Sequence, residues 1–378
     1  MPKENKEKKN TEIKIKETPF WKKYRIAIIF ATLAIIIAGT GITYAYMNQS
    51  TPPATAKKET KNTQAEKTTP SNERHLDGRR VAIKDANKYP VAVMIENLSP
   101  VRPQAGLGQA QVVYESLVEG GITRFMAIYD LSEKIDEIGP VRSARPYYLE
   151  WVSEYDALYA HAGGSPEALQ AISGFNIHDL NQIGGAQGYY WRSDSVPAPH
   201  NLFTSTELLT RAINDNKLAD VEPTYTPWTF TDDPEDNKKS TDKEVQATAA
   251  SNISIDFSSP SYKVEYAYDA TTKEYLRSNG GVPHTDKNTE QQIRAKTVVV
   301  VSIPPVTDVG EKGRITLSIH GGGPVRIARF GEVITGTWKK ADRTARTEFF
   351  DARGEKIDLG RGNIWVEIVP EDKGVEFK

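Results

Sequence analysis

The hydrophobicity pattern begins with an uncharged run of 22 residues, Ile26–Met47 (IAIIFATLAIIIAGTGITYAYM). As an α-helix this run extends about 33 Å, enough to cross the hydrocarbon core of a bilayer. Lys22, Lys23 and Arg25 precede it, and flanking positive charge stays on the cytoplasmic side. The pattern predicts a single-pass transmembrane helix, with a Lys-rich cytoplasmic tail over residues 1–25 and an extracellular remainder.

A cleaved signal peptide is the alternative, because Ala54-Thr55-Ala56 resembles a small-x-small cleavage site. The apolar run is longer than a typical signal-peptide core, and the site lies well beyond its end. We therefore expect the helix to be retained as an anchor. Either alternative places the rest of the chain outside the cell.

Residues 48–80 are rich in Thr, Lys, Pro and Asn and have little to bury, which predicts a disordered linker. Residues 81–227 then alternate apolar segments with helical ones, which predicts an α/β or α+β ectodomain. Ser165-Pro166-Glu167 predicts a helix start, with Ser at the N-cap and Pro at the first position. The expected strands are 89–95, 111–115, 124–129 and 157–160, and the other expected helices are 143–152 and 204–214.

Residues 228–250 contain the charged stretch TDDPEDNKKSTDK, which predicts a connection between domains. Residues 251–378 show short strand patterns separated by Gly and Asp/Asn turns, without a helical period. They predict a mostly antiparallel β domain. The expected strands are 262–268, 297–302, 314–319, 325–330, 332–338 and 364–369.

The charge and the cysteine content exclude several classes of function. The chain's net charge is −2. Residues 1–25 carry +5 and residues 48–80 carry +3, which leaves −10 for the folded part. An acidic ectodomain argues against nucleic-acid binding through a broad basic surface. With no cysteine, disulfides, thiol nucleophiles, Cys-ligated metals and lipid attachment through cysteine are excluded. We expect no cofactor.

Arg142 and Arg145 form the first candidate ligand-binding pair. They stand three residues apart at the start of a predicted helix, so that both side chains can face the same way. Two guanidinium groups suit a carboxylate or phosphate ligand. The alternative is internal ion pairing with Glu115, Glu119 or Glu150.

The segment His161-Ala162-Gly163-Gly164-Ser165 forms the second candidate. Gly163 and Gly164 allow a ligand to approach the backbone, and the helix start after them offers free amides to an anion. Ser165 is also a candidate nucleophile, with His161 or His200 as its base, and Asn201 lies next to His200. The alternative is an ordinary N-cap at Ser165, because no G-x-S-x-G motif is present.

Metal binding has only weak candidates. His161, His178, Asp194 and His200 are suitable ligand types, but their spacing matches no known motif such as H-E-x-x-H. We therefore expect no metal site.

Two further patterns are interpreted structurally. Tyr147, Trp151 and Tyr155 have the spacing of one helix face, which favours core packing over an exposed sugar platform. His320-Gly321-Gly322-Gly323-Pro324 lacks the Lys-Ser/Thr ending of a phosphate-binding loop, so we interpret it as a flexible connection between strands.

Several strings together resemble the YerB-like family of bacterial envelope proteins, which includes lipoproteins and is built on domains of unknown function. The resemblance covers most of residues 81–220 and, more loosely, 338–350 and 360–370. The family implies a two-part extracytoplasmic protein without an established activity. Because the chain has no cysteine, its anchor would be the helix rather than a lipid. The matching strings are PVAVMIEN (90–97), RPQAGL (102–107), ESLVEGGITR (115–124), GPVRSARP (139–146), HAGGSP (161–166) and PHNL (199–202).

These observations leave two functional hypotheses. The first is a noncatalytic protein of the cell envelope that binds an anionic wall polymer, a glycan or an envelope protein through the first ectodomain. The second is an envelope hydrolase that uses His161 and His200, with or without a metal. The absence of a recognisable catalytic set favours the first.

Overall fold

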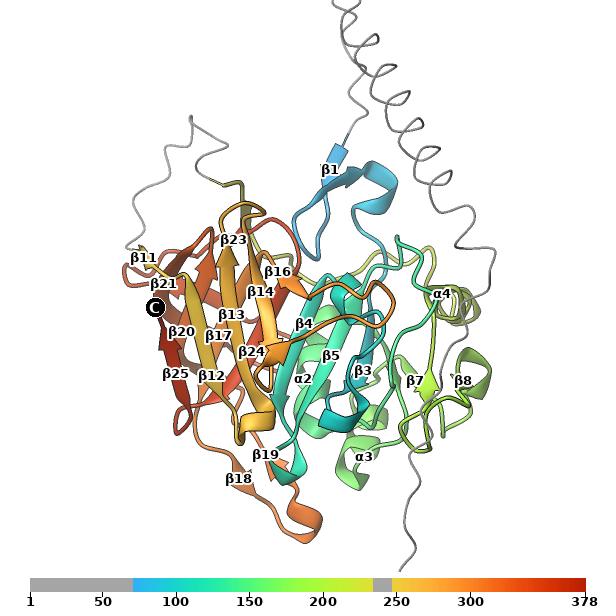
Figure 1. Cartoon of the computed structure of the whole chain (residues 1–378). Helices are drawn as coiled ribbons and strands as arrows, with labels where there is room; N and C mark the ends of the chain where they lie inside the picture. Colours follow the sequence, from blue (N-terminus) through green and yellow to red (C-terminus); the bar gives the residue numbers. More distant parts are fainter. Residues whose placement is uncertain (1–70, 234–246) are drawn as a thin grey trace, which may run out of the picture. The chain divides into compact units, whose positions relative to one another are not determined.

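The computed structural model describes residues 71–233 and 247–378, all of which belong to one compact unit. No helix among these residues has the length and hydrophobicity needed to cross a membrane. The predicted cytoplasmic tail, the predicted span Ile26–Met47 and most of the predicted linker lie outside them. The described part is mixed α/β with mostly β content (Figure 1).

The centre of the molecule is an 11-stranded sheet of mixed direction. Its strand order is β11-β21-β20-β17-β24-β4-β5-β3-β6-β7, and β22 pairs with β21. The strands β17, β24 and β4 are parallel neighbours, as are β3, β6 and β7. The bounds are β3 Val91–Glu96, β4 Val112–Leu117, β5 Thr123–Tyr129, β6 Leu158–His161, β7 Asp179–Asn181, β11 Ala247–Ala249, β17 Thr297–Ile303, β20 Gly321–Arg329, β21 Glu332–Lys340, β22 Glu348–Asp351 and β24 Ile364–Pro370.

This sheet runs across the predicted boundary at residues 228–250. Strand β24 pairs in parallel with β4, so that Ile364 lies opposite Val112 and Glu367 opposite Glu115. The two predicted domains therefore share one sheet. Most strand pairs within the C-terminal part are antiparallel, as expected, and β17–β24 is a parallel exception.

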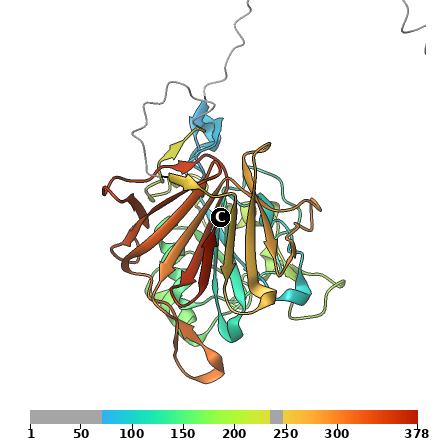
Figure 2. The same ribbon diagram turned by 60° about the vertical axis from the view of Figure 1, so that its left-hand side comes forward.

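A second sheet of six strands packs on one face of the central sheet (Figures 1 and 2). Apolar side chains from both sheets, such as Val264, Val113 and Trp365, form a common core. Both faces of the central strands are thus covered, which explains why all six residues of β3 are buried. The second sheet contains β12 Asn252–Asp256, β13 Lys263–Asp269, β14 Glu274–Asn279, β15 Val282–Pro283, β16 Arg294–Ala295 and β25 Gly374–Phe377.

The helices α2 (Pro146–Tyr155) and α3 (Pro166–Gly174) contribute to the core on the opposite face, whereas α4 (Thr206–Asp215) contributes to the core shared with the second sheet. Tyr147, Trp151 and Tyr155 are buried, which confirms their predicted core role. Four short ladders complete the fold. They are β1–β2 (Ser71–Glu73, Arg80–Ala82), β8–β9 (Trp191–Arg192, Leu202–Phe203), β10–β23 (Phe230–Thr231, Leu359–Gly360) and β18–β19 (Thr307–Asp308, Ile315–Thr316).

Several local predictions are wrong. The last residues of the predicted disordered linker, 71–80, form β1 and the start of β2, and Leu76 between them is 1% exposed. The helix expected from Ser143 begins at Pro146 instead, because residues up to Arg145 continue as extended backbone. The glycines 321–323 belong to β20 rather than to a flexible connection. There, β20 passes close to Trp338 on β21, and a Cβ at Gly323 would lie 2.9 Å from the indole nitrogen. The glycines permit this close pairing of strands.

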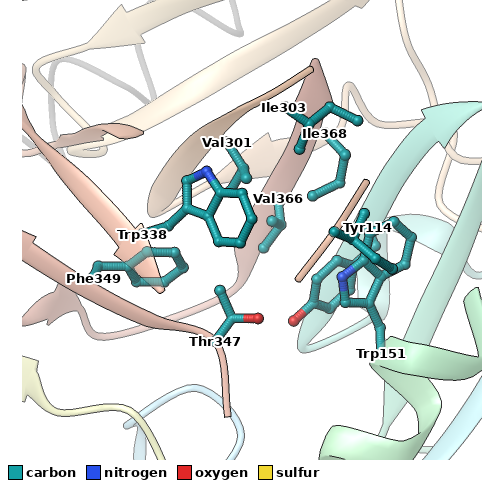
Figure 3. A pocket seen from close by; sticks show the side chains of 10 residues that line it. Tyr114, Trp151, Val301, Ile303, Trp338, Thr347, Phe349, Val366 and Ile368 are labelled. Carbon is teal, nitrogen blue, oxygen red and sulfur yellow. The ribbon is translucent and has the colours of Figure 1, made fainter. Parts of the chain in front are cut away.

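An apolar pocket lies where α2 meets the C-terminal strands (Figure 3). Trp151 and Tyr114 stack with ring centroids 5.2 Å apart on one side, and Trp338 faces them from β21. The lining is almost entirely aromatic and aliphatic, so this pocket does not offer a site for a charged ligand. Its lining residues are Tyr114, Trp151, Val301, Ile303, Ile319, Trp338, Thr347, Phe349, Val366 and Ile368.

Candidate functional site

The carboxyl ends of β3, β4 and β6 lie at one edge of the central sheet, the usual position of ligand sites in open α/β sheets. The extended segment 141–145 runs between the ends of β3 and β6. Arg142 N donates to Met94 O (2.9 Å), and Ala162 N donates to Arg142 O (3.0 Å). Ala144 N donates in the same way to Gly163 O (2.9 Å). This backbone pairing brings residues 142–145 and 161–165 together.

Arg142 and His200 share one buried carboxylate, that of Glu96 at the end of β3. Arg142 Nε lies 3.2 Å from Glu96 Oε1, and His200 Nδ1 lies 2.8 Å from Glu96 Oε2. The side chain of Glu96 is 7% exposed, whereas those of Arg142 and His200 are about one quarter exposed (24% and 25%). Glu96 therefore orients a guanidinium and an imidazole that both remain accessible.

Arg145 pairs with Glu119, one of the alternatives that the sequence left open. Its Nε and Nη2 both donate to this carboxylate, the second at 2.9 Å. Burial raises the pKa of Glu119, but the hydrogen bond from Arg145 and its charge outweigh burial and hold the pKa below its usual value. Arg142 and Arg145 thus bind separate carboxylates and do not share a helix face as predicted.

Arg124, at the start of β5, is the third guanidinium of this edge, and sequence reasoning did not select it. It is 8% exposed, and its Nη1 donates to Ser143 O (2.7 Å). Among the described residues it forms no ion pair. Burial and the charge of Arg145 lower its pKa. We call Arg124, Arg142 and Arg145 the arginine cluster.

The cluster carries one more positive charge than its carboxylate partners, because three arginines face only Glu96 and Glu119. The buried hydroxyl of Tyr159 has no hydrogen-bond partner among the described residues. Burial raises the pKa of Tyr159, and the charges of Arg124 and Arg145 oppose this effect, so the phenol lies within their field. An acidic protein thus has a local cationic excess at this edge.

His161 and Ser165 are used internally. His161 is fully buried, with Nδ1 2.7 Å from Gly163 O and Nε2 2.7 Å from Asp179 Oδ1. Neither ring nitrogen is free to act as a base. Ser165 Oγ accepts a hydrogen bond from Ala168 N (3.3 Å), the geometry of the N-cap. The N-cap alternative for Ser165 is therefore confirmed.

The remaining candidates have ordinary surroundings. Gly163 has a φ of +63°, and its amide donates to Asn181 Oδ1 (2.9 Å). Gly164 packs against Ala144, where a Cβ would lie 3.2 Å from the alanine's own Cβ. Asn201 bridges Arg192 Nη1 (2.8 Å) and Ser193 O (3.0 Å). These residues shape the loops around the cluster.

The weak metal candidates do not gather. His178 lies near Asp156 (3.9 Å), Asp194 is exposed, and His161 is bonded to Asp179. Within residues 71–233 and 247–378, no group of three or more His, Asp or Glu side chains is arranged to hold a metal ion.

A buried polar network between the two sheets also escaped sequence reasoning. Its centre is Arg277, which is fully buried and donates to Glu115, with the Glu367 carboxylate 3.9 Å from its Nε. Trp365 lies under its guanidinium at 4.6 Å. The available signal was a charged residue at an inward position of β14, between Tyr275 and Asn279. The buried network comprises Glu115, Arg277, Glu367, Tyr266, His284, Asn97, Gln104 and Thr123.

Both halves of the chain match models of known protein families. Residues 76–219 match the N-terminal domain, and residues 253–366 the C-terminal domain, of a family described as "Protein of unknown function (DUF3048)". The chain belongs to this DUF3048 family. The arginine cluster and every site residue predicted from the sequence lie in the N-terminal domain, whereas Arg277 of the buried network lies in the second.

Within this family, the chain is similar to the "Putative lipoprotein YerB" of Bacillus subtilis (strain 168). The two are 29% identical over 299 residues, which is 78% of this chain and 86% of the relative. It is also similar to the crystal structure of YerB from Bacillus subtilis, with a TM-score of 0.69 and 28% identity. That likeness covers 81% of this chain and 99% of the solved one. The DUF3048 match and the YerB likeness agree with the resemblance inferred from the sequence strings.

Proposed function

We propose that this DUF3048 protein is anchored in the bacterial cell membrane, exposes its folded part outside the cell and binds an anionic envelope polymer at the arginine cluster. The uncharged run Ile26–Met47 supports the anchor. The family likeness to a protein named as a lipoprotein supports the envelope location. Neither observation bears on the ligand, which is argued from the cluster alone.

The observation that carries the ligand class is the guanidinium of Arg124, which has no carboxylate partner in the part of the chain that the structure describes. A buried cation without a carboxylate is unfavourable, and a bound anion relieves this cost. Arg142 lies at the same edge, already oriented by Glu96, and adds a partly exposed guanidinium donor. Phosphate and carboxylate groups both suit such donors.

Binding of the detergent-solubilised full chain to poly(glycerol phosphate), with neutral dextran as reference, tests the proposal. Arg124→Gln removes a cation without orphaning a carboxylate, so the fold should persist. Charge-assisted hydrogen bonds contribute about 1.5–3 kcal/mol, so affinity should fall about tenfold or more. Arg142→Gln should act in the same direction. Arg79→Gln changes a guanidinium side chain that is 45% exposed and serves as the control, with no loss expected.

Equal affinity for the charged and neutral polymers, or wild-type affinity in Arg124→Gln, would reject the anion site. Inorganic phosphate as a competitor separates recognition of a phosphate group from general polyanion binding. Because polyanion attraction weakens with salt, the titration is repeated at two ionic strengths.

A hydrolase that uses His200 is the second candidate, and the Glu96–His200 pair favours it. Glu96 holds Nδ1, and among the described residues Nε2 has no hydrogen-bond partner, which is the arrangement of an oriented general base. Polymer breakdown in the binding mixture, lost in His200→Gln, would support this candidate. Intact polymer after prolonged incubation would reject it.

A further inference from the structure

The end of β3 and the start of β5 place an amide beside a hydroxyl in the buried interior. Asn97 Nδ2 donates to Thr123 Oγ1 at 2.7 Å. The residues Asn97 and Thr123 are 1% and 0% exposed. Thr123 Oγ1 in turn donates to Glu115 Oε1 at 2.5 Å. Asn97 Nδ2 also reaches the same carboxylate oxygen, at 3.2 Å. One buried carboxylate thus contacts both a potential nucleophile and a potential leaving group.

The amide oxygen of Asn97 is surrounded by donors. Asn97 Oδ1 accepts from Arg102 Nε (2.8 Å), Gln104 Nε2 (3.1 Å) and Asn279 Nδ2 (3.1 Å). Donors at these distances from a carbonyl oxygen are the arrangement that stabilises an oxyanion during acyl transfer. The three donors also fix which end of the amide is the oxygen. The carbonyl of Asn97 is therefore polarised more strongly than that of an ordinary side-chain amide.

From this geometry we propose that Thr123 and Asn97 form an intramolecular ester bond. Glu115 removes the proton of Thr123 Oγ1, and this oxygen attacks Cγ of Asn97. The negative charge that develops on Oδ1 is held by Arg102, Gln104 and Asn279. Glu115 then passes its proton to Nδ2, the Cγ–Nδ2 bond breaks and ammonia leaves. The step requires no oxidant, reductant or cofactor, and the product links Cγ of Asn97 to Oγ1 of Thr123.

The surroundings provide what such a reaction needs. Groups held in contact react with a large effective concentration, and a positioned carboxylate supplies general-base catalysis. Arg277 donates to Glu115, Trp365 lies under the Arg277 guanidinium, and Glu115 is 0% exposed, so bulk solvent does not reach this carboxylate. The distances in the structure are those of the unreacted side chains.

The ester would serve the purpose that a disulfide serves in other exported proteins. The chain has no cysteine, and the bond would close the segment between residues 97 and 123. A covalent link of this kind stabilises mainly by restricting the unfolded chain. It acts in the core of the fold and is independent of ligand binding at the arginine cluster.

Mass spectrometry of the purified full chain tests the proposal directly. The chain should be lighter than its sequence mass by one ammonia. Trypsin should release residues 89–124 as one peptide, because Arg102 precedes a proline. That peptide should carry the whole deficit. Backbone cleavages between residues 97 and 123 should yield no separated fragments, because both halves remain joined through the ester.

Variants separate the ester from other losses of ammonia. Thr123→Ser should retain the deficit, and Thr123→Val should restore the full sequence mass. A full sequence mass in the folded wild-type chain overturns the proposal. So does a deficit that persists in Thr123→Val, because Asn97 would then have cyclised onto the backbone. The wild-type measurement stands even if a variant fails to fold. Hydroxylamine treatment of the denatured chain should open the ester and restore normal fragmentation.

Discussion

The arginine cluster and the buried network are both built from arginines and glutamates, but they differ in solvent exposure and in charge balance. In the network, Arg277 and the carboxylates of Glu115 and Glu367 are all 0% exposed. In the cluster, the side chains of Arg142 and Arg145 are 24% and 16% exposed, and those of their partners Glu96 and Glu119 are 7% and 21% exposed. The network is closed to solvent and holds the two sheets together. The cluster stays open and retains an unmatched positive charge. The partial exposure of Arg142 and Arg145, rather than residue type, distinguishes the proposed ligand site from the structural network.

The largest predicted loss of stability follows from a substitution of Arg277. Arg277→Met removes the cation and leaves the two carboxylates buried without it, which costs about 3–5 kcal/mol of unfolding free energy. Urea unfolding of residues 67–378 at neutral pH would measure the loss. Arg79→Met, at a side chain that is 45% exposed, should change stability by less than about 1 kcal/mol. Equal losses of unfolding free energy in the two variants would show that the buried Arg277 contributes no more to stability than an exposed arginine.

The second prediction concerns Glu367 and pH. Burial and the neighbouring Glu115 raise the pKa of Glu367 well above its usual 4.5. Above about pH 4.5, the folded state therefore binds more protons than the unfolded state. Stability should then fall as pH rises from about 4.5 toward the folded pKa, by at most about 1.4 kcal/mol per pH unit.

Glu367→Gln tests this pH effect because glutamine mimics the protonated carboxyl. Urea unfolding at pH 5 and pH 8 should show a loss of stability in the wild-type chain and a smaller loss in the variant. Glu265→Gln, on the outer face of β13 with a 43% exposed side chain, is the matched control. Parallel behaviour of wild type and Glu367→Gln would show that Glu367 is ionised in the folded state.

The same contrast explains what the sequence could and could not predict. Strands such as β3 and β17 follow from apolar runs that need burial on both faces, and α3 follows from Ser165 and Pro166. The pairing of β24 with β4 joins residues about 250 positions apart, which no local pattern encodes. The family strings led to the edge of the sheet where Arg142 and Arg145 lie. They did not show that Arg145 would pair with Glu119 or that Arg124 would lack a carboxylate.

His161 illustrates the remaining limit. Its sequence context of glycines before a helix is shared by catalytic and structural histidines. Only the three-dimensional positions of Asp179 and the Gly163 carbonyl show that both ring nitrogens are occupied. For Arg277, the inward position on β14 was readable from the alternation, but its partner Glu115 lies 162 residues away. Long-range partners decide the role of a polar residue.

The smallest predicted effect lies in the Arg145–Glu119 pair. The two side chains are 16% and 21% exposed, so solvent screens their attraction and Arg145→Gln should cost about 1 kcal/mol or less. The pKa of Glu119 is lowered in the folded state. The stabilisation is therefore present above about pH 4.5 and is lost as pH falls through the folded pKa. The difference in unfolding free energy between wild type and Arg145→Gln should be measurable at pH 7 and should vanish near pH 3. A difference that persists at pH 3 would mean that Arg145 acts through packing of its side chain, and the cluster would then resemble the buried network more than an open site.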